Sequence, residues 1–150
     1  MSRPPRTVKL MSAISQLKAA DRKIRILIAD DHPLIRKTVR AVLEEDPRFE
    51  VCGEAINGAA AIEETGRLKP DVVVLNVVMP VLNGLEAARF IKYRVPETVI
   101  VILSSDADEE FVKQAKKAGA QAYVSKSRAG DALISAIEAA LPGGEFVFVE

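Results

Sequence analysis

A regular alternation of short apolar segments with longer segments of helical periodicity constrains the fold of this chain more than any other feature. Apolar runs of strand length occupy residues 24–29, 49–54, 72–76, 99–103 and 122–124. A segment with apolar residues at helical spacing follows each run, beginning at Pro33 and then covering about 57–68, 85–93, 106–118 and 128–141. Repeated units of this length predict a parallel sheet with helices on both faces. We therefore expect an α/β fold with a doubly wound, five-stranded parallel sheet.

Local signals support several of the predicted helix ends. Pro33 suits a first helical turn because its missing N–H would have no helical partner there. Asp106 followed by Glu109 resembles a capping box, and Gly119 is typical of a helix end. The adjacent Asn83 and Gly84 are interpreted as turn residues.

Composition excludes several classes of protein. Lys and Arg total 21, as do Asp and Glu, so no overall field favours nucleic acid, and no basic run marks a local site for it. Single Cys52 and His32 residues leave no internal disulfide and no Cys/His zinc cluster. No apolar run approaches the roughly 20 residues of a membrane span. These features favour a cytoplasmic protein that does not bind nucleic acid directly.

The 150 residues suffice for a single domain, with an extension at each end. Residues 1–22 are an N-terminal extension, which either forms a short amphipathic helix or frays. The domain is expected to cover residues 23–141. Residues 142–150 are a C-terminal tail or linker stub, whose apolar residues 146–148 leave a docking segment as the alternative.

Polar residues follow four of the five predicted strands. The first strand ends in Asp30 and Asp31, the third in Asn76 and the fourth in Ser104, while Lys126 follows the fifth. Ligands of open parallel sheets bind beyond the carboxyl ends of the strands. We therefore expect these side chains to converge on one edge of the sheet.

That combination suits a divalent cation beside a phosphoryl group. The carboxylates of Asp30 and Asp31 are hard oxygen ligands of the kind that Mg²⁺ prefers. Lys126 provides a point positive charge and Ser104 a hydroxyl donor for phosphoryl oxygens. An acid pair alone is more often a set of solvated loop charges, and His32 beside it is expected to serve the loop and the helix start.

These residues and their spacings resemble the receiver domains of two-component response regulators, which have a (βα)5 flavodoxin-like fold. The resemblance covers residues 23–141. The segments Asp-Asp-His-Pro and Ala-Gly-Ala-Gln-Ala-Tyr are similar to receivers that precede a LuxR-type helix-turn-helix. The matching residues are Asp30, Asp31, Met79, Pro80, Gly84, Ser104, Tyr123 and Lys126.

The resemblance implies phosphotransfer from a histidine kinase or phosphotransfer protein, with Mg²⁺ as cofactor. Asp31 would bind the metal directly and Asp30 largely through water. The carbonyl of Val78 and the side chain at position 76 would complete the protein ligands.

The resemblance also implies a switch. Ser104 and Lys126 would contact the phosphoryl group, and the ring of Tyr123 would turn inward as the Ser104 hydroxyl moves. The surface of the fourth helix, fifth strand and fifth helix would then meet a partner, including a second copy in a homodimer.

Position 76 departs from the family pattern, because Asn76 stands where the phosphate-accepting aspartate is expected. An amide is not a competent nucleophile at neutral pH, so we expect no phosphorylation there. Losing one of three carboxylates, which repel by about 1–4 kcal/mol per pair at ~4 Å, should also stabilise the metal-free pocket and weaken Mg²⁺ binding. The substitution is either natural or engineered.

Three functional hypotheses remain open. The first is a phosphorelay receiver module that regulates through protein–protein interaction. The second is a natural pseudo-receiver that acts as an adaptor without phosphorylation, and the third is the receiver fragment of a DNA-binding transcriptional regulator. An enzyme is not expected, because no glycine-rich turn follows the first strand and the adjacent acids at 30 and 31 lack the spacing of an aspartyl phosphatase.

Overall fold

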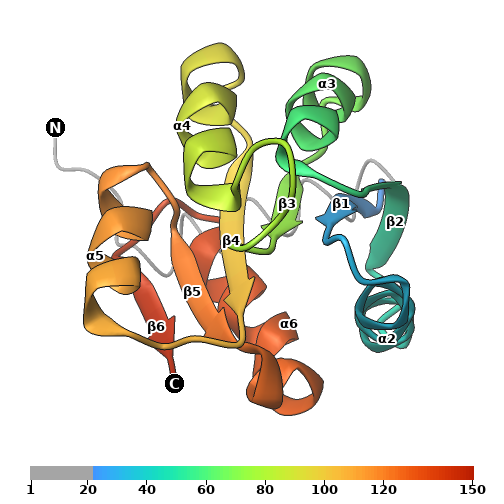
Figure 1. Cartoon of the computed structure of the whole chain (residues 1–150). Coiled ribbons are helices and arrows are strands. Elements are labelled where there is room, and N and C mark those ends of the chain that lie inside the picture. The colour runs from blue at the N-terminus through green and yellow to red at the C-terminus, as the bar shows by residue number, and fades with distance from the viewer. Residues whose placement is uncertain (1–21) are drawn as a thin grey trace, which may run out of the picture.

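The computed structural model describes residues 22–150, which form a parallel sheet with helices on both faces (Figure 1). The predicted helix of the N-terminal extension lies outside the described residues. The strands are β1 (Ile24–Ala29), β2 (Phe49–Ala55), β3 (Val72–Leu75), β4 (Val99–Ser104), β5 (Ala122–Ser125) and β6 (Val147–Val149). The helices are α2 (Pro33–Glu44), α3 (Gly58–Leu68), α4 (Gly84–Arg94), α5 (Glu109–Lys117), the 3-10 turn η1 (Lys126–Arg128) and α6 (Ala129–Ala140). No helix in the described part is long and apolar enough to cross a membrane.

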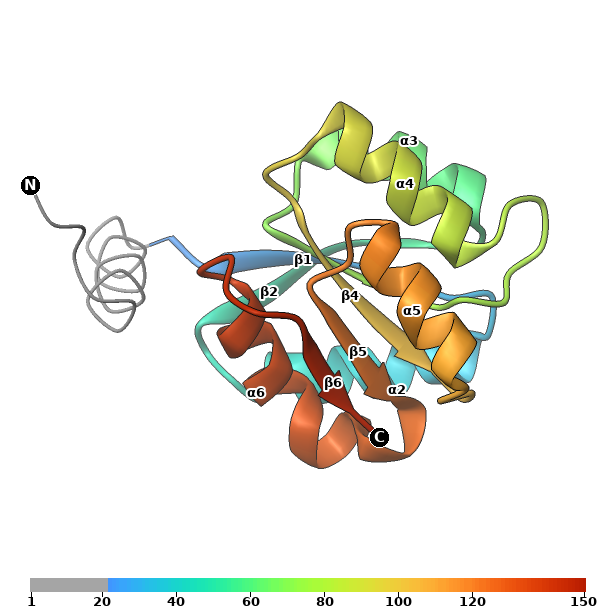
Figure 2. The same cartoon turned by 90° about the vertical axis from the view of Figure 1, so that its left-hand side faces the viewer.

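The sheet confirms the doubly wound α/β prediction. Its six strands follow the order β2-β1-β3-β4-β5-β6, and every pairing is parallel. Helices α2 and α6 cover one face, while α3, α4 and α5 cover the other (Figures 1 and 2). The direction of winding reverses between β1 and β3, which is where open α/β sheets bind ligands.

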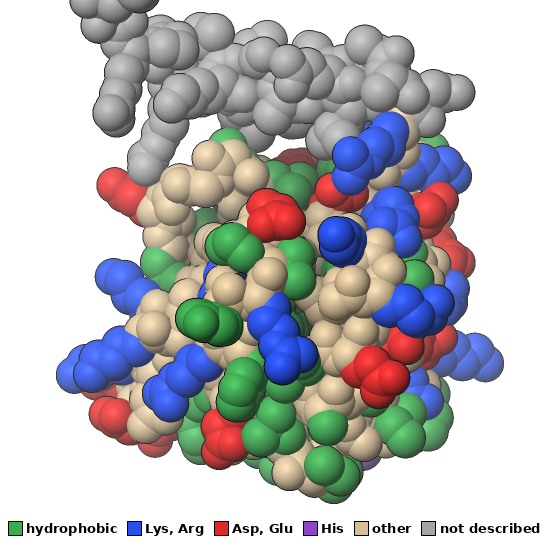
Figure 3. Space-filling model, turned by 90° about the horizontal axis from the view of Figure 1, so that it is seen from above, with side chains coloured by type: hydrophobic (Ala, Val, Ile, Leu, Met, Phe, Trp, Pro, Cys, Tyr) green, Lys and Arg blue, Asp and Glu red, His purple; other side chains and the backbone are tan. Residues whose placement is uncertain are grey.

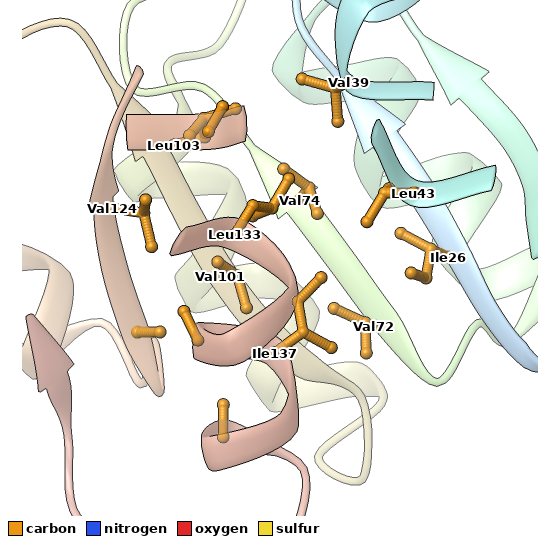
Figure 4. Close-up of a cluster of buried hydrophobic side chains, with 14 of the residues drawn as sticks. Ile26, Val39, Leu43, Val72, Val74, Val101, Leu103, Val124, Leu133 and Ile137 are labelled. Atoms are coloured by element: carbon orange, nitrogen blue, oxygen red, sulfur yellow. The ribbon is translucent and has the colours of Figure 1, made fainter. Parts of the chain in front are cut away.

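Two hydrophobic cores lie on opposite faces of the sheet, and β3 contributes to both. All four of its residues are buried. Val72 and Val74 belong to the core beneath α2 and α6, which includes Leu133 and Ile137 of α6 (Figure 4). Val73 and the last residue of β3 belong to the opposite core. Full burial of such side chains is worth about 1.5–3 kcal/mol each, so this strand anchors the polar residue that follows it.

The sheet has one strand more than the five predicted. The additional strand, β6, lies within residues 142–150, which the sequence indicated as a tail or linker stub. It pairs with β5 at the edge of the sheet (Figure 2). The α5–β5–α6 surface expected to meet a partner therefore includes this segment.

The predicted capping box at the start of α5 is wrong in position. The N-cap is Asp108, whose side chain accepts a hydrogen bond from the backbone N–H of Glu110 at 2.8 Å. Asp106 lies two residues earlier and accepts from the N–H of Asp108 at 2.9 Å. The helix therefore begins at Glu109, and Asp106 belongs to the loop after β4.

Candidate functional site

Asp30 is a buried carboxylate at the carboxyl end of β1, only 3% exposed. Its Oδ2 lies 2.9 Å from the Nζ of Lys126, which follows β5. Arg36, in the first helix after β1, donates to the Asp30 backbone carbonyl at 2.7 Å. A buried charge needs a partner, because its desolvation is otherwise costly. The ion pair with Lys126 supplies one and joins two distant strand ends.

Asp31 and His32 form a cluster of polar side chains with Asp30. The Nδ1 of His32 lies 3.1 Å from an Asp30 oxygen and 3.2 Å from an Asp31 oxygen. One ligand atom from each of the three residues lies within 4.8 Å of the others. His32 is the N-cap of α2, but its side chain makes no capping hydrogen bond. Its ring lies against the acids, so the residue does more than begin the helix.

Asn76 immediately follows β3 and is 5% exposed. Its Nδ2 donates to the backbone carbonyl of Val78 at 2.8 Å and lies 3.4 Å from an Asp31 carboxylate oxygen. The amide N–H group thus lies between two oxygens that the resemblance assigns to a metal ion. A hydrogen-bond donor at that point partly neutralises the oxygens that a cation would otherwise hold.

The loop after β3 is held close to Asn76 by a glycine. The Gly84 N–H donates to the Val77 carbonyl at 2.7 Å. A Cβ at position 84 would lie 1.9 Å from the Asn76 backbone oxygen, so only glycine fits. Asn83, which the sequence indicated as a turn residue, is the N-cap of α4 and accepts from the N–H of Glu86 at 3.0 Å, while Gly84 is the first residue of that helix. The close approach of Gly84 to the backbone of residues 76 and 77 fixes the position of the Asn76 main chain, and with it the origin of the Asn76 side chain.

Ser104, the last residue of β4, and Tyr123, the second residue of β5, are linked through Asp106. The Ser104 hydroxyl accepts from the Asp106 N–H at 3.1 Å, and the Tyr123 hydroxyl donates to the Asp106 carbonyl. Tyr123 is fully buried, with its ring inside the domain. Burial raises the pKa of Tyr123, a hydrogen bond with Ser104 opposes this rise, and the negative charges of Asp106 and Asp108 add to it.

The strand ends therefore gather the predicted site residues in two neighbouring groups. Hydrogen bonds and close contacts join Asp30, Asp31, Asn76 and Lys126, together with the Val78 carbonyl. Ser104 and Tyr123 form the second group, in which Ser104 ends β4 and Tyr123 lies within β5, opposite Ile102. The sequence did not lead us to predict the hydrogen bond from Arg36 to the Asp30 carbonyl. The available signal was a basic residue in the first turn of the helix that follows the acid pair.

The first group has the chemistry of a cation site beside an anion site. Carboxylate and carbonyl oxygens of Asp30, Asp31 and Val78 match the donors that Mg²⁺ prefers, so the residues present fit this ion in type. Asn76 adds one amide oxygen, but its NH₂ group faces these donors. The Lys126 side chain, 15% exposed, supplies the positive charge that an anionic ligand would meet.

Comparison with known proteins identifies one family. The family model "Response regulator receiver domain" matches residues 26–138. The transcriptional regulatory protein DegU of Brevibacillus brevis is 37% identical over 127 residues, which are 85% of this chain and 54% of DegU. The uncharacterized transcriptional regulatory protein YxjL of Bacillus subtilis is 41% identical over 121 residues, covering 81% of this chain and 56% of YxjL. The chain thus spans about half the length of these curated relatives.

Solved structures agree with these relatives. A two-component response regulator of the LuxR family from Aurantimonas superposes with a TM-score of 0.79 at 34% identity, covering 83% of this chain and 89% of that one. The response regulator domain of Thermotoga maritima CheB gives a TM-score of 0.72 at 27% identity, covering 79% and 96%. A protein-glutamate methylesterase from Pyrococcus abyssi is 46% identical, but the match covers only 26% of its length.

Proposed function

The chain belongs to the response regulator receiver family, and from this premise we propose that it is a phosphorelay signalling module that acts through protein contacts and does not accept phosphate at Asn76. Receivers exchange phosphoryl groups with histidine kinases or phosphotransfer proteins, so these are the partners that we propose. The module itself is proposed to have no enzymatic activity. Methylesterase relatives share only the receiver-like part of their length with this chain.

The position of the Asn76 amide is the observation that supports this proposal most. Its nitrogen is engaged by the Val78 carbonyl and faces Asp31, at the place where an acceptor carboxylate is expected. The lone pair of an amide nitrogen is delocalised into the carbonyl, and the amide carries no negative charge to attack phosphorus. The remaining pocket residues keep their charges, so the site is proposed to retain the shape of a receiver without its nucleophile.

Mg²⁺ is proposed to bind this pocket more weakly than it would bind an aspartate form. Asp31, Asp30 through water, the Val78 carbonyl and the Asn76 side-chain oxygen would hold the ion. When bound, the metal would supply positive charge beside an incoming phosphoryl group. The Asn76 NH₂ group must first give up its hydrogen bond to Val78, and one fewer carboxylate attracts the ion.

Ser104, Tyr123 and Lys126 are proposed as the phosphoryl-contact and switch residues. Lys126 is paired with Asp30, so a phosphoryl oxygen would compete with that carboxylate for the ammonium. Ser104 and Tyr123 share Asp106 as a backbone partner, which couples the hydroxyl at the pocket to the buried ring. A movement of the loop after β4 would therefore reach both side chains.

The module is proposed to act in the cytoplasm, with the α5–β5–α6 surface as its contact with partners or a second copy. Direct binding of nucleic acid by this chain is not proposed. On the face seen in Figure 3, Lys and Arg side chains are interspersed with Asp and Glu rather than forming one continuous basic area. The chain as a whole carries 21 residues of each sign.

The receiver part of a DNA-binding regulator is the second candidate function. DegU and YxjL are named as transcriptional regulatory proteins, and both are about twice as long as their match to this chain. In such a protein an output segment would bind DNA and this domain would control it. A natural pseudo-receiver acting as an adaptor differs in regulating its partner without any phosphoryl signal.

Incubation with a small phosphodonor and Mg²⁺, followed by intact mass measurement, tests the absence of an acceptor. We expect no added phosphoryl mass on the Asn76 chain and one phosphoryl group on an Asn76→Asp variant. Asn57→Asp is the matched control, because Asn57 caps α3 and its side chain accepts from the Ala60 N–H instead of contacting the pocket carboxylates. A phosphoryl group mapped to residue 76 of undeamidated protein would refute the proposal.

A further inference from the structure

The outer edge of β5 is covered by a segment of the same chain. Strand β6 runs parallel to β5, with Ala122 opposite Val147 and Val124 opposite Val149. The Val147 N–H donates to the Gln121 carbonyl at 3.0 Å, which fixes the start of the pairing. Figures 1 and 2 both place β6 alongside β5 at the end of the sheet.

Side chains of this segment alternate between the two faces of the sheet. Val147 and Val149 pack on the core that α6 covers. Phe146 packs on the opposite core, with the Lys116 ammonium 5.9 Å from its ring centroid. The Phe148 ring stacks on Tyr123, with centroids 5.9 Å apart and planes inclined by 28°. The edge of β5 thus receives apolar side chains on both faces, as an internal strand position would.

The pairing is small and open to solvent. Strand β6 has three residues, and Phe148 is 42% exposed. The turn before it contains Gly143 at a φ of +72° and Gly144, with open space around the Gly143 Cβ position. A short edge strand with half-exposed side chains opens at a lower free-energy cost than the buried strands. Its removal would leave a row of unpaired backbone groups on β5.

We propose that the β5 edge between α5 and α6 is a strand-docking surface, and that residues 146–149 are its resident and displaceable occupant. The site takes an extended segment parallel to β5, with aromatic side chains on the α5 side and β-branched ones on the α6 side. Backbone hydrogen bonds provide the affinity of such strand addition, and the alternate side chains provide its selectivity. The chain's own segment has this pattern, so it keeps other strands off the edge.

The docking surface is also joined to the polar pocket by direct contacts. Phe148 covers the ring of Tyr123, whose hydroxyl donates to the Asp106 carbonyl. The Asp106 N–H in turn donates to Ser104. Displacement of β6 therefore uncovers the ring that is tied to the loop after β4. The backbone pairing that defines strand docking involves only β5 and β6, so its test is independent of the proposed phosphotransfer role.

A synthetic peptide of residues 145–150 with an N-terminal fluorophore tests this proposal by fluorescence anisotropy. The full chain is compared with a truncation that ends at residue 144. We expect the truncated chain to bind the peptide at least about tenfold more tightly, because a segment tethered by a short linker competes at an effective concentration of order mM. A peptide carrying Val147→Pro lacks the N–H that bonds Gln121 and should not bind.

A full chain carrying Val147→Pro provides a second readout if the truncation unfolds. This variant keeps the length and most apolar groups of the tail but loses its first backbone hydrogen bond, so it should bind the unmodified peptide more tightly than the original chain does. Equal binding by the full and truncated chains overturns the proposal. So does the absence of peptide binding by variants that circular dichroism shows to be folded, or the unfolding of both variants, since a displaceable segment is not required for the fold.

Discussion

Replacing Asn76 by Asp should destabilise the metal-free protein and make its stability depend on Mg²⁺. The new carboxylate would lie near Asp31, from which the Asn76 nitrogen is now 3.4 Å away. Two unit charges at that separation repel by about 1 kcal/mol in water and about 5 kcal/mol at an effective dielectric constant of 20. The substitution also removes the hydrogen bond to the Val78 carbonyl, worth about 1 kcal/mol.

The expected net cost is about 2 kcal/mol, towards the lower end of this range, because the Asp31 side chain is 30% exposed and the neighbouring Asp30 is paired with Lys126. For a domain of this size, a loss of about 2 kcal/mol lowers Tm by roughly 4–8 °C. Mg²⁺ at about 100 times its dissociation constant would return about 2.7 kcal/mol to the aspartate form. The Asn76 chain should show a smaller response.

Thermal and urea unfolding in EDTA and in Mg²⁺ measure these changes for both proteins. Asn57→Asp makes the same change in charge at a helix N-cap, where aspartate is as favourable as asparagine, so its stability should stay close to the original with or without Mg²⁺. The reasoning fails if Asn76→Asp matches the original chain in EDTA. It also fails if Mg²⁺ stabilises the Asn76 chain as much as the variant.

Two further predictions concern contacts elsewhere in the fold. The Arg48 side chain hydrogen-bonds Asp46 and lowers the pKa of the Asp46 carboxyl. The ionised carboxyl therefore stabilises the fold fully above about pH 4, the ordinary pKa of an aspartate in the unfolded chain. This stabilisation is lost as the pH falls through the lower pKa of the folded state. Asp46→Asn should cost about 1 kcal/mol at neutral pH and less in acid, as urea unfolding at several pH values would show; a cost independent of pH would contradict this. Gly84→Ala places a Cβ 1.9 Å from a backbone oxygen and should lower the free energy of unfolding by about 2–3 kcal/mol. Gly66 lies on a helix with open space around its Cβ position, so Gly66→Ala should raise the free energy of unfolding by about 0.5–1 kcal/mol. Thermal unfolding compares the two, and equal effects would be evidence against the close approach at Gly84.

The central strands of the sheet were predictable because burial on both faces requires an unbroken run of apolar residues. Strand β3 is apolar throughout, and the structure buries every one of its residues. The site was predictable for a related reason: parallel strands place their carboxyl ends at one edge, so Asp30, Asn76 and Lys126 needed only a strand assignment to be brought together.

The features that were missed depend on contacts between distant segments. Three residues, 147–149, are too short a segment for a strand to be predicted from sequence, and pairing with β5 sets their conformation. Asp106 and Asp108 both stand shortly before Glu109 and Glu110, so local sequence does not decide which one caps the helix. The backbone of Asp106 is held by Ser104 and Tyr123, which keeps it in the loop and leaves the cap to Asp108.

The order of the strands has a consequence for how the chain emerges during synthesis. A nascent chain exposes β5 before β6, because translation proceeds from the N-terminus and residues 147–149 follow the whole of α6. The five preceding strands are therefore complete while the last edge still lacks its cover. During that interval the nascent chain exposes the unpaired edge of β5. At high expression levels, strands of other polypeptides should therefore mispair with this edge before they mispair elsewhere.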